Sequence, residues 1–413
     1  MSQPQPTPLK QPIRVLFSTI DGFGHILPLL PLARALRRTG HSVTFMAPAP
    51  ARVILEPEGF SLLPAGPSID DVVAATASRH PEILELPPER RIESAIPIFA
   101  DVRVELTVPE ALAAARAWRP DVIISEHSDF VGPLVAALIG ARRVTLGFGP
   151  GHAADLLALA TDQVAKHYRA HGLKAPRRGG LYEGVYFDTC PPDLQSPRFS
   201  APVDSRPLRP EPAASASQAW SLPDFAERAD RPLVLLTLGT VFNDTALLST
   251  ALAGLAQLDV NVVATVGPDG DPDAISVDPG RVRIERFVPL GLLLEHCDLV
   301  VAHGGAGTTL AALAHGIPLV MIPQGADQFI NTARVVKAGA GLPVPPARCT
   351  SEAVRDAATL VLQMRSYTAS ARRIAAQIAT MPAPELVASE LVKSIHEDTL
   401  LGQQRRPLCT KHA

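Results

Sequence analysis

Apolar runs of strand length alternate with amphipathic stretches of helical length along the first part of the chain. The runs IRVLFSTI (13–20) and HSVTFMAP (41–48) flank HILPLLPLARALRRTG, whose apolar spacing predicts a helix that ends at Gly40. DVIISE (121–126) and RRVTLGF (142–148) each follow another helical stretch. Strands joined by such crossovers are parallel, and fully apolar strands suit a sheet covered on both faces. The pattern predicts a doubly wound α/β domain.

A second alternating series begins at LVLLTLGT (233–240) and includes DLVVAH (298–303) and PLVMIP (318–323). Between the two series, the segment 191–223 is rich in proline, which neither helix nor strand tolerates in its interior, so we interpret it as a linker. The predicted division is therefore a first domain at 13–200, a linker at 201–230, a second domain at 231–383, a final helix at 384–396, and disordered tails at 1–12 and 397–413.

Charge and composition exclude several classes of function. Lys and Arg total 38 against 41 Asp and Glu, so the chain has no charge excess that favours nucleic acid as a partner. No apolar run approaches the roughly 20 residues of a membrane span, and the polar, proline-rich start does not resemble a signal peptide. The four cysteines are scattered, which is typical of a reducing compartment and provides no zinc site. We expect a soluble, cytoplasmic protein.

The segment DLVVAHGGAGTTLAALAHG carries the strongest chemical signal. A buried strand ends at His303, a glycine-rich turn follows, and Thr308 is predicted to open a helix. Unpaired N–H groups and the positive end of the helix dipole suit an anionic phosphate. The alternative is a glycine-rich turn that binds nothing.

Asp327 and Gln328 directly follow the next strand, at the sheet edge where open α/β sheets bind ligands. A carboxylate beside a carboxamide can accept from and donate to several hydroxyls of one sugar. Taken alone, Asp327 is equally typical of a helix N-cap.

HGGAGT followed by GIPLVMIPQGADQFINTARV strongly resembles the nucleotide-sugar motif of the family-1 glycosyltransferases with the GT-B fold, most of all the actinobacterial enzymes that decorate antibiotics. The resemblance recurs in GFGHILPLLPLARALRRTGHSVTFMAP and so covers both halves of the chain. It implies two Rossmann-like domains that face each other across a cleft, the first for the acceptor and the second for the nucleotide sugar. It also implies that the helix 384–396 crosses back to the first domain.

The same resemblance implies roles for single residues in the second half. Asp327 and Gln328 would grip the sugar, Phe287 stands where plant members stack a tryptophan on the base, and Val288 would meet the base through its backbone. Thr240 lies in a loop that approaches the nucleotide. The diphosphate would be held by His303, Gly304, Gly305, Ala306, Gly307 and Thr308.

One position departs from the plant members, which place a glutamate eight residues after the motif histidine to accept from the ribose hydroxyls. Here that position is Ala311. Because a lost hydrogen bond to a charged group costs about 1.5–3 kcal/mol, we expect a thymidine-diphosphate sugar to be preferred over a uridine-diphosphate sugar.

The first half is expected to supply the catalytic base. His25 follows the first strand and a turn flanked by Gly22 and Gly24, and an imidazole with a near-neutral pKa can take a proton from a hydroxyl. The family motif, GHILP in this chain, implies that His25 is this base. A partner carboxylate is implied at Glu126, with Asp129 as the rival. A histidine that only bonds backbone at a helix start is the alternative.

No metal site is expected. DGDPD (269–273) combines its aspartates with glycine and proline, which is typical of a turn, and the diphosphate charge is matched by the helix terminus and His303. The nucleotide sugar is a co-substrate, and no cofactor is predicted.

Together these features predict an inverting transferase that moves a hexose to a hydroxyl of an apolar aglycone of polyketide or macrolide type. The segments 66–100 and 150–187 would build the acceptor pocket. Alternatives are a uridine-diphosphate-sugar enzyme acting on a lipid or sterol, a sugar-nucleotide 2-epimerase, and a non-catalytic homologue. The aglycone, the attachment through oxygen or carbon, a homodimer and an auxiliary protein are left open by the sequence.

Overall fold

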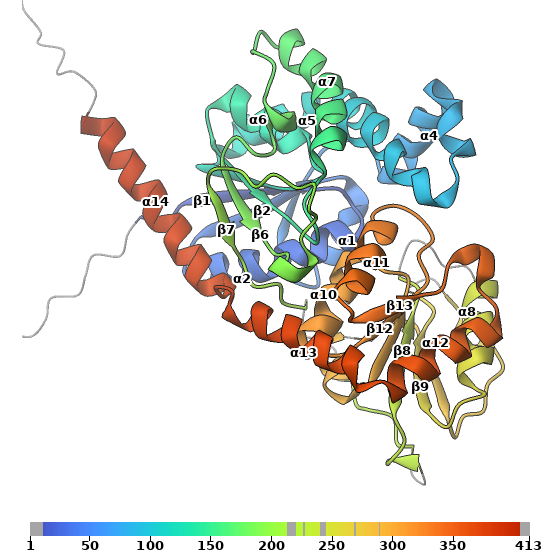
Figure 1. The fold of residues 1–413 in the computed structure, drawn as a ribbon. Coiled ribbons are helices and arrows are strands. Elements are labelled where there is room, and N and C mark those ends of the chain that lie inside the picture. The colour runs from blue at the N-terminus through green and yellow to red at the C-terminus, as the bar shows by residue number, and fades with distance from the viewer. Residues whose placement is uncertain are drawn as a thin grey trace, which may run out of the picture.

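The computed structural model describes residues 11–212, 220–225, 228–239, 245–267, 270–288 and 290–404, the side chains of 398–404 excepted. Within these residues the chain forms two parallel sheets of seven and six strands, each covered by helices (Figure 1). None of the described helices combines the length and apolar character needed to cross a membrane.

The first sheet has the strand order β3-β2-β1-β4-β5-β6-β7, and every neighbouring pair is parallel. Its strands are β1 (Arg14–Ser18), β2 (Ser42–Ala47), β3 (Ser61–Pro64), β4 (Val122–Glu126), β5 (Arg142–Leu146), β6 (Val185–Asp188) and β7 (Ser205–Pro207). The order reverses between β1 and β4, so the carboxyl ends of these two strands flank the point where such sheets bind ligands.

The second sheet repeats this arrangement in the order β10-β9-β8-β11-β12-β13, again all parallel. Its strands are β8 (Leu233–Thr237), β9 (Asn261–Thr265), β10 (Val282–Glu285), β11 (Leu299–Ala302), β12 (Leu319–Met321) and β13 (Gly341–Pro343). Its reversal lies between β8 and β11, and the predicted glycine-rich turn follows β11.

Helices cover both faces of each sheet. The first half contains α1 (Phe23–Ile26), α2 (Leu30–Arg38), α3 (Arg52–Leu55), α4 (Ile69–Arg79), α5 (Arg103–Trp118), α6 (Val131–Ile139) and α7 (Ala154–Ala170), with a π-helical segment, η5 (Ile96–Val102), leading into α5. The second half contains α8 (Thr245–Leu255), α9 (Leu290–Leu293), α10 (Ala306–Ala314), α11 (Gln328–Lys337), α12 (Ser351–Gln363) and α13 (Arg365–Thr380), and α14 (Pro384–Gln404) ends the described chain.

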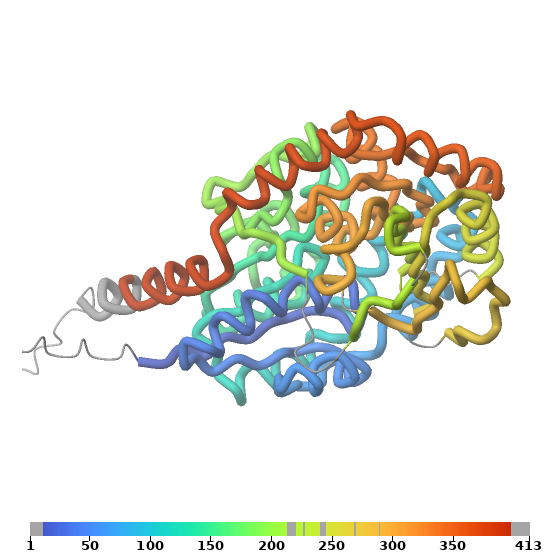
Figure 2. The backbone as a smooth tube through the Cα atoms, turned by 90° about the horizontal axis from the view of Figure 1, so that it is seen from below, coloured from blue at the N-terminus to red at the C-terminus, as the bar shows by residue number. Residues whose placement is uncertain are grey.

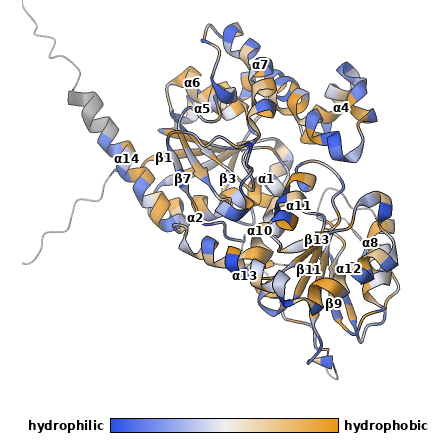
Figure 3. Ribbon diagram, viewed as in Figure 1, coloured by the Kyte–Doolittle hydropathy of each residue, from blue (hydrophilic) through white to orange (hydrophobic). Residues whose placement is uncertain are grey.

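Alternate residues of the central strands enter different cores, as a sheet buried on both faces requires. In β1, Val15 and Phe17 pack in one apolar cluster while Leu16 packs in another. In β8, Leu235 and Leu236 divide in the same way. Figure 3 shows largely apolar strands between helices in which apolar and polar residues alternate. The predicted doubly wound architecture is therefore present in both halves.

Two predicted boundaries differ from the structure. The first sheet continues to β7, within the segment 201–230 predicted as linker. Proline is compatible with an edge strand, and Pro207 ends this one. At the other end, α14 runs to Gln404, beyond residue 396, where the helix was predicted to end. Extending an existing helix costs far less than starting one, so the residues after 396 can remain helical.

The last helix joins the two halves. α14 leaves the second half after α13 and runs along the first half beside α2 (Figures 1 and 2). Its residues Val387, Leu391 and Ile395 are buried in the same cluster as Leu32 and Leu36 of α2.

Candidate active site

A cavity of about 1040 Å³ lies between the carboxyl ends of the two sheets. Residues that follow β1, β4 and β5 line it from the first half, and residues that follow β8, β9, β11 and β12 line it from the second. Most of the predicted site residues are lining residues, namely His25, Phe287, Val288, His303, Gly305, Ala306, Gly307, Thr308, Asp327 and Gln328. Glu126 lies directly behind His25, Gly304 forms the turn, and Thr240 is outside the described residues.

His25 lies in the short helix α1, where its ring meets the last residue of β4. Its Nδ1 is 3.0 Å from Oε1 of Glu126, whose side chain is completely buried, while that of His25 is 23% exposed. The other carboxylate oxygen accepts from the backbone N–H of Ser128. If the carboxylate is ionised it can only accept, so Nδ1 carries the hydrogen and Nε2 keeps a free lone pair. Phe99 and Phe148 lie beside the imidazole, at ring-centroid distances of 6.0 and 5.2 Å.

Asp129, the other candidate partner of His25, is bonded to other groups. Its carboxylate forms a buried ion pair with Arg103 and accepts from the backbone N–H groups of Val131 and Gly132 at the start of α6. The structure therefore places Glu126, and not Asp129, against His25.

The glycine-rich turn begins at Gly304, where φ is +89°, and α10 begins at Ala306. The sequence pattern predicted the helix to start at Thr308, which is too late. The first hydrogen bond of the helix runs from Thr309 N to Gly305 O. The N–H groups of residues 306–308 therefore have no partner within the helix and lie at the cavity wall.

His303 is clamped between two glycines. A Cβ atom on Gly239 would lie 2.8 Å from Nε2 of His303, and one on Gly305 would lie 2.4 Å from it. Burial lowers the pKa of His303 to about 4, opposed by a hydrogen bond with the backbone of Thr237. At neutral pH the ring is therefore uncharged.

This lowered pKa predicts acid sensitivity. Because the unfolded chain binds a proton near pH 6.5 and the folded chain only near pH 4, His303 contributes stability above pH 6.5 that is lost as the pH falls. We expect this group to lower the free energy of unfolding by about 2 kcal/mol between pH 7 and pH 5. Urea unfolding at both pH values measures the change. The variant His303→Gln should show a shallower pH dependence, and an equal slope in both proteins would contradict the assignment.

Asp327 precedes α11 but its side chain does not cap the helix. Its Oδ2 instead accepts from Nδ2 of Asn331 at 2.8 Å, and the same amide donates to the carbonyl of Gly304 at 2.8 Å. Burial raises the pKa of Asp327, while Asn331, His25 and His152 lower it. Asn331 thus ties the glycine-rich turn to the carboxylate predicted to bind the sugar. Asn331 was not predicted as a site residue, although its i, i+4 spacing from Asp327 is a usable signal.

The Gln328 amide is only partly available. Its Oε1 accepts from the backbone N–H groups of Gln324 and Gly325, at 2.7 and 3.2 Å. A carbonyl oxygen has two lone pairs, so this group can offer a ligand only its N–H donors. The expectation that Gln328 both donates to and accepts from sugar hydroxyls is corrected to donation alone.

The two residues predicted to bind the base of the nucleotide, Phe287 and Val288, differ in how exposed they are. Phe287 is 37% exposed and Val288 is 2% exposed, so the aromatic face of Phe287 is accessible while Val288 is part of the core. Two further sets of lining residues were given no individual role from the sequence: the segment 208–212, and the histidines His127 and His152, although His152 lies in the segment 150–187 predicted to build the acceptor pocket. No local motif marks either set, because both reach the cavity through the arrangement of loops.

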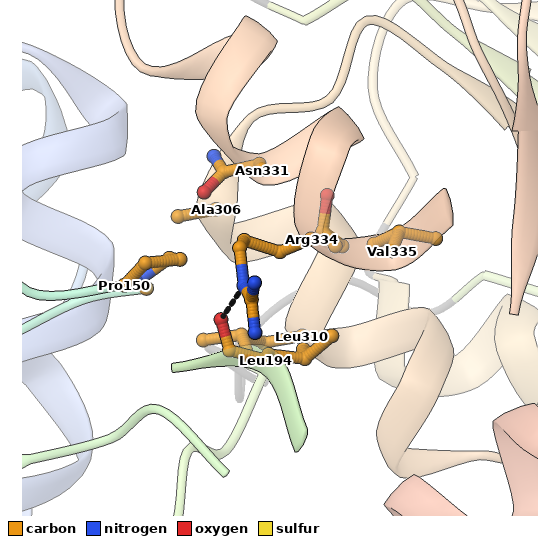
Figure 4. Close-up of a pocket in the computed structure, with 9 residues that line it drawn as sticks. Pro150, Leu194, Ala306, Leu310, Asn331, Arg334 and Val335 are labelled. Carbon is orange, nitrogen blue, oxygen red and sulfur yellow. Dashed lines mark hydrogen bonds between the residues drawn. The ribbon is translucent and has the colours of Figure 1, made fainter. Parts of the chain in front are cut away.

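The two halves touch beside the glycine-rich turn. Figure 4 shows Pro150, from the loop after β5, next to Ala306 at the start of α10. In the same view Nε of Arg334 in α11 donates to the carbonyl of Leu194 at 3.0 Å. The two halves are thus in contact at the edge of the cavity.

Among the described residues no group of three or more His, Cys, Asp or Glu side chains is placed to hold a metal ion. That transfer needs no metal stays a prediction.

Comparisons with known proteins place both halves of the chain in one family. The family model described as "Erythromycin biosynthesis protein CIII-like, N-terminal domain" matches residues 34–195, and the corresponding C-terminal domain matches residues 249–394. These matches cover more than half of the chain.

Individual relatives agree with this placement. The elloramycin glycosyltransferase ElmGT of Streptomyces olivaceus is 30% identical, over 92% of this chain and 97% of its own. Tylactone mycaminosyltransferase of Streptomyces fradiae is 29% identical, over 91% of each chain. The solved structure of the glycosyltransferase SsfS6 of Streptomyces sp. SF2575, complexed with thymidine diphosphate, is 26% identical with a TM-score of 0.74, over 92% of this chain and 99% of that one.

The resemblance stated from the motifs is confirmed by these matches, and so are the GT-B fold and the enzyme class. The chain belongs to the erythromycin biosynthesis protein CIII-like family of glycosyltransferases.

Proposed function

We propose that this glycosyltransferase moves a hexose from a thymidine-diphosphate sugar to a hydroxyl of an apolar natural-product aglycone, with inversion at the anomeric carbon. The observation that carries the proposal is that both halves of the chain line the same cavity. The His25–Glu126 pair opens onto it from the first half, and the amino end of α10 and Asp327 open onto it from the second.

His25 is the general base in this proposal. Its Nε2 removes the proton from the acceptor hydroxyl as the oxygen attacks the anomeric carbon, and Glu126 stabilises the imidazolium that forms. One direct displacement by the acceptor inverts the configuration of that carbon.

The leaving diphosphate moves toward the turn at 304–308. Negative charge grows on its oxygens, and the N–H groups of Ala306, Gly307 and Thr308 together with the dipole of α10 are already aimed at that place. We infer that these groups and His303 replace a metal ion, so transfer should persist in the presence of EDTA.

The acceptor side of the cavity supports an apolar aglycone. The segment 66–100, predicted to build the acceptor pocket, contributes several apolar lining residues, namely Ile69, Val73, Ile83, Leu84, Ile92, Ile98 and Phe99, and Leu156 adds to them from α7. A large apolar wall with few polar groups favours a hydrophobic small molecule over a polysaccharide. The names of the relatives, which act in tylactone and elloramycin glycosylation, support a natural-product aglycone.

Ala311 supports a thymidine nucleotide. It lines the cavity in α10 and brings no carboxylate to a ribose 2′-hydroxyl. The SsfS6 structure that resembles this chain holds thymidine diphosphate.

We therefore expect thymidine diphosphate to bind about tenfold or more tightly than uridine diphosphate, because burying an unpartnered hydroxyl costs about 1–3 kcal/mol. Calorimetric titration of both nucleotides measures the difference. Tighter binding of uridine diphosphate would overturn the donor assignment.

The whole proposal is tested by incubating the protein with a thymidine-diphosphate hexose and a panel of hydroxylated aglycones, and detecting the adduct by mass. An adduct with the opposite anomeric configuration to the donor is expected. Solvent deuterium that enters the sugar without any aglycone would indicate an epimerase instead. Nucleotide binding with neither reaction would indicate a non-catalytic homologue.

A further inference from the structure

The loop between β5 and α7, residues 148–153, brings a second imidazole to the cavity. His152 lines it, and its ring nitrogen Nε2 is 2.7 Å from the backbone carbonyl of His127. Neither histidine has a part in the reaction described above.

The ring of His152 belongs to a continuous row that starts at the base. His25 meets the edge of Phe148 at 5.2 Å, Phe148 lies 4.2 Å from His127, and His127 lies 4.5 Å from His152 between ring centroids. His152 therefore packs on His127, and through His127 and Phe148 it is connected to the base.

The backbone of this loop is also held from behind. Gly151 donates its N–H to Oε1 of Gln195 at 2.8 Å, and the amide of Gln195 donates to Asp188 at 2.9 Å. Alanine at Gly151 would not fit, because its Cβ would lie 2.3 Å from the ring of Phe199. The backbone of this loop is thus fixed by these contacts, and the loop forms one wall of the cavity.

The same loop reaches the nucleotide half next to the predicted sugar site. Gly149, with φ of +81°, lies so close to it that a Cβ there would be 3.0 Å from Cβ of Ala306 and 3.5 Å from Oδ1 of Asn331. Asn331 in turn holds Asp327. His152 and Asp327 both line the cavity. Burial lowers the pKa of His152 and raises that of Asp327, and the electrostatic attraction between the two residues opposes both shifts.

The hydrogen bond to His127 decides what His152 offers to a ligand. A carbonyl oxygen only accepts, so Nε2 of His152 must carry the hydrogen. Burial lowers the pKa of His152, which keeps the ring neutral near pH 7 and leaves Nδ1 without a hydrogen. Nδ1 has no partner among the described residues and is therefore a free hydrogen-bond acceptor.

We propose that Nδ1 of His152 accepts a hydrogen bond from a hydroxyl of the donor sugar, which Asp327 contacts from the other half. His152 is then a specificity-determining residue. Together with the carboxylate of Asp327, it selects hexoses whose hydroxyl groups can donate hydrogen bonds on the side of the sugar ring that faces these two residues. The inference rests on the proposed function, since it takes a nucleotide sugar to be the ligand of this cavity.

Binding measurements without an acceptor test this contact. Thymidine-diphosphate glucose and thymidine diphosphate are titrated into the wild type, His152→Phe, His152→Gln and the control His171→Phe, which changes an exposed histidine at the end of α7. We expect His152→Phe to weaken binding of the sugar nucleotide roughly five- to tenfold and to leave that of the free nucleotide within about twofold. His152→Gln should recover most of the loss, because its amide oxygen can accept. His171→Phe should match the wild type.

Unchanged affinity of His152→Phe for the sugar nucleotide would overturn the inference. Equal losses for both nucleotides would also overturn it, since they would indicate a purely structural role. Failure of the proposed function looks different: the wild type would bind the sugar nucleotide with the expected dependence on His152 and yet transfer no sugar to any aglycone.

Discussion

Replacing His25 by alanine is expected to lower the rate of glycosyl transfer about 10²- to 10⁴-fold. The acceptor hydroxyl has a pKa far above neutrality, so without a base it attacks with its proton still attached. His25 is the group placed for this task, because Glu126 holds its Nδ1 and Nε2 is left free at the cavity. Single-turnover transfer to a hydroxylated aglycone measures the effect.

The affinity for thymidine diphosphate should not change in His25→Ala, since His25 belongs to the first half and the diphosphate turn to the second. The variant Glu126→Gln should lie between wild type and His25→Ala, because the amide keeps the shape of the carboxylate but not its charge. His171→Ala is a matched control outside the cavity. Transfer by His25→Ala at the wild-type rate would remove the base assignment.

Replacing Gly305 by alanine is expected to weaken thymidine diphosphate binding by about 10²-fold. The new Cβ would lie 2.4 Å from Nε2 of His303, which is closer than such atoms approach, so the imidazole or the turn must move. Either movement disturbs His303 and the N–H groups at the start of α10 together. Two hydrogen bonds to a charged group contribute about 1.5–3 kcal/mol each, which justifies an effect of this size.

The control for this variant is Gly291→Ala in α9. The nearest atom to its new Cβ is Cγ of Pro212 at 3.7 Å, which is an ordinary contact. Calorimetry gives the affinities, and thermal unfolding shows whether either variant loses stability. Wild-type affinity in Gly305→Ala would mean that the diphosphate does not depend on this turn.

Several differences between prediction and structure arise because the prediction used only the local sequence pattern. The glycines of the turn lower helix propensity, so α10 was predicted to start at Thr308, although a first turn needs no internal hydrogen bonds and tolerates glycine. Prolines suggested that the linker begins at 201, although an edge strand, β7, accepts one. The strands β3, β6, β7 and β13, each three or four residues long, were missed; β11 and β12 are equally short, but they lie in the longer runs 298–303 and 318–323 that mark them as strands.

The partner of His25 shows the limit of motif reasoning. Glu126 and Asp129 lie in one short segment, and both are carboxylates. The two differ only in what surrounds them, since Arg103 and the start of α6 occupy Asp129 while the end of β4 directs Glu126 toward His25. Contacts with Arg103 and His25, which are distant in the chain, therefore decide which of the two carboxylates is the partner of His25.

Contiguous stretches of the chain were enough to predict the two doubly wound sheets, the glycine-rich turn at 304–308 and His25 as the candidate base. These depend on short-range periodicity and on motifs in which neighbouring residues act together. The role open to Gln328, the lowered pKa of His303 and the bridging by Asn331 depend on contacts within the folded second half, and the approach of Gly149 to Ala306 and Asn331 depends on the packing of the two halves. Burial is set by residues far away in the sequence, and even the short-range partners of Gln328 and Asn331 form only in the geometry that the folded chain imposes on them.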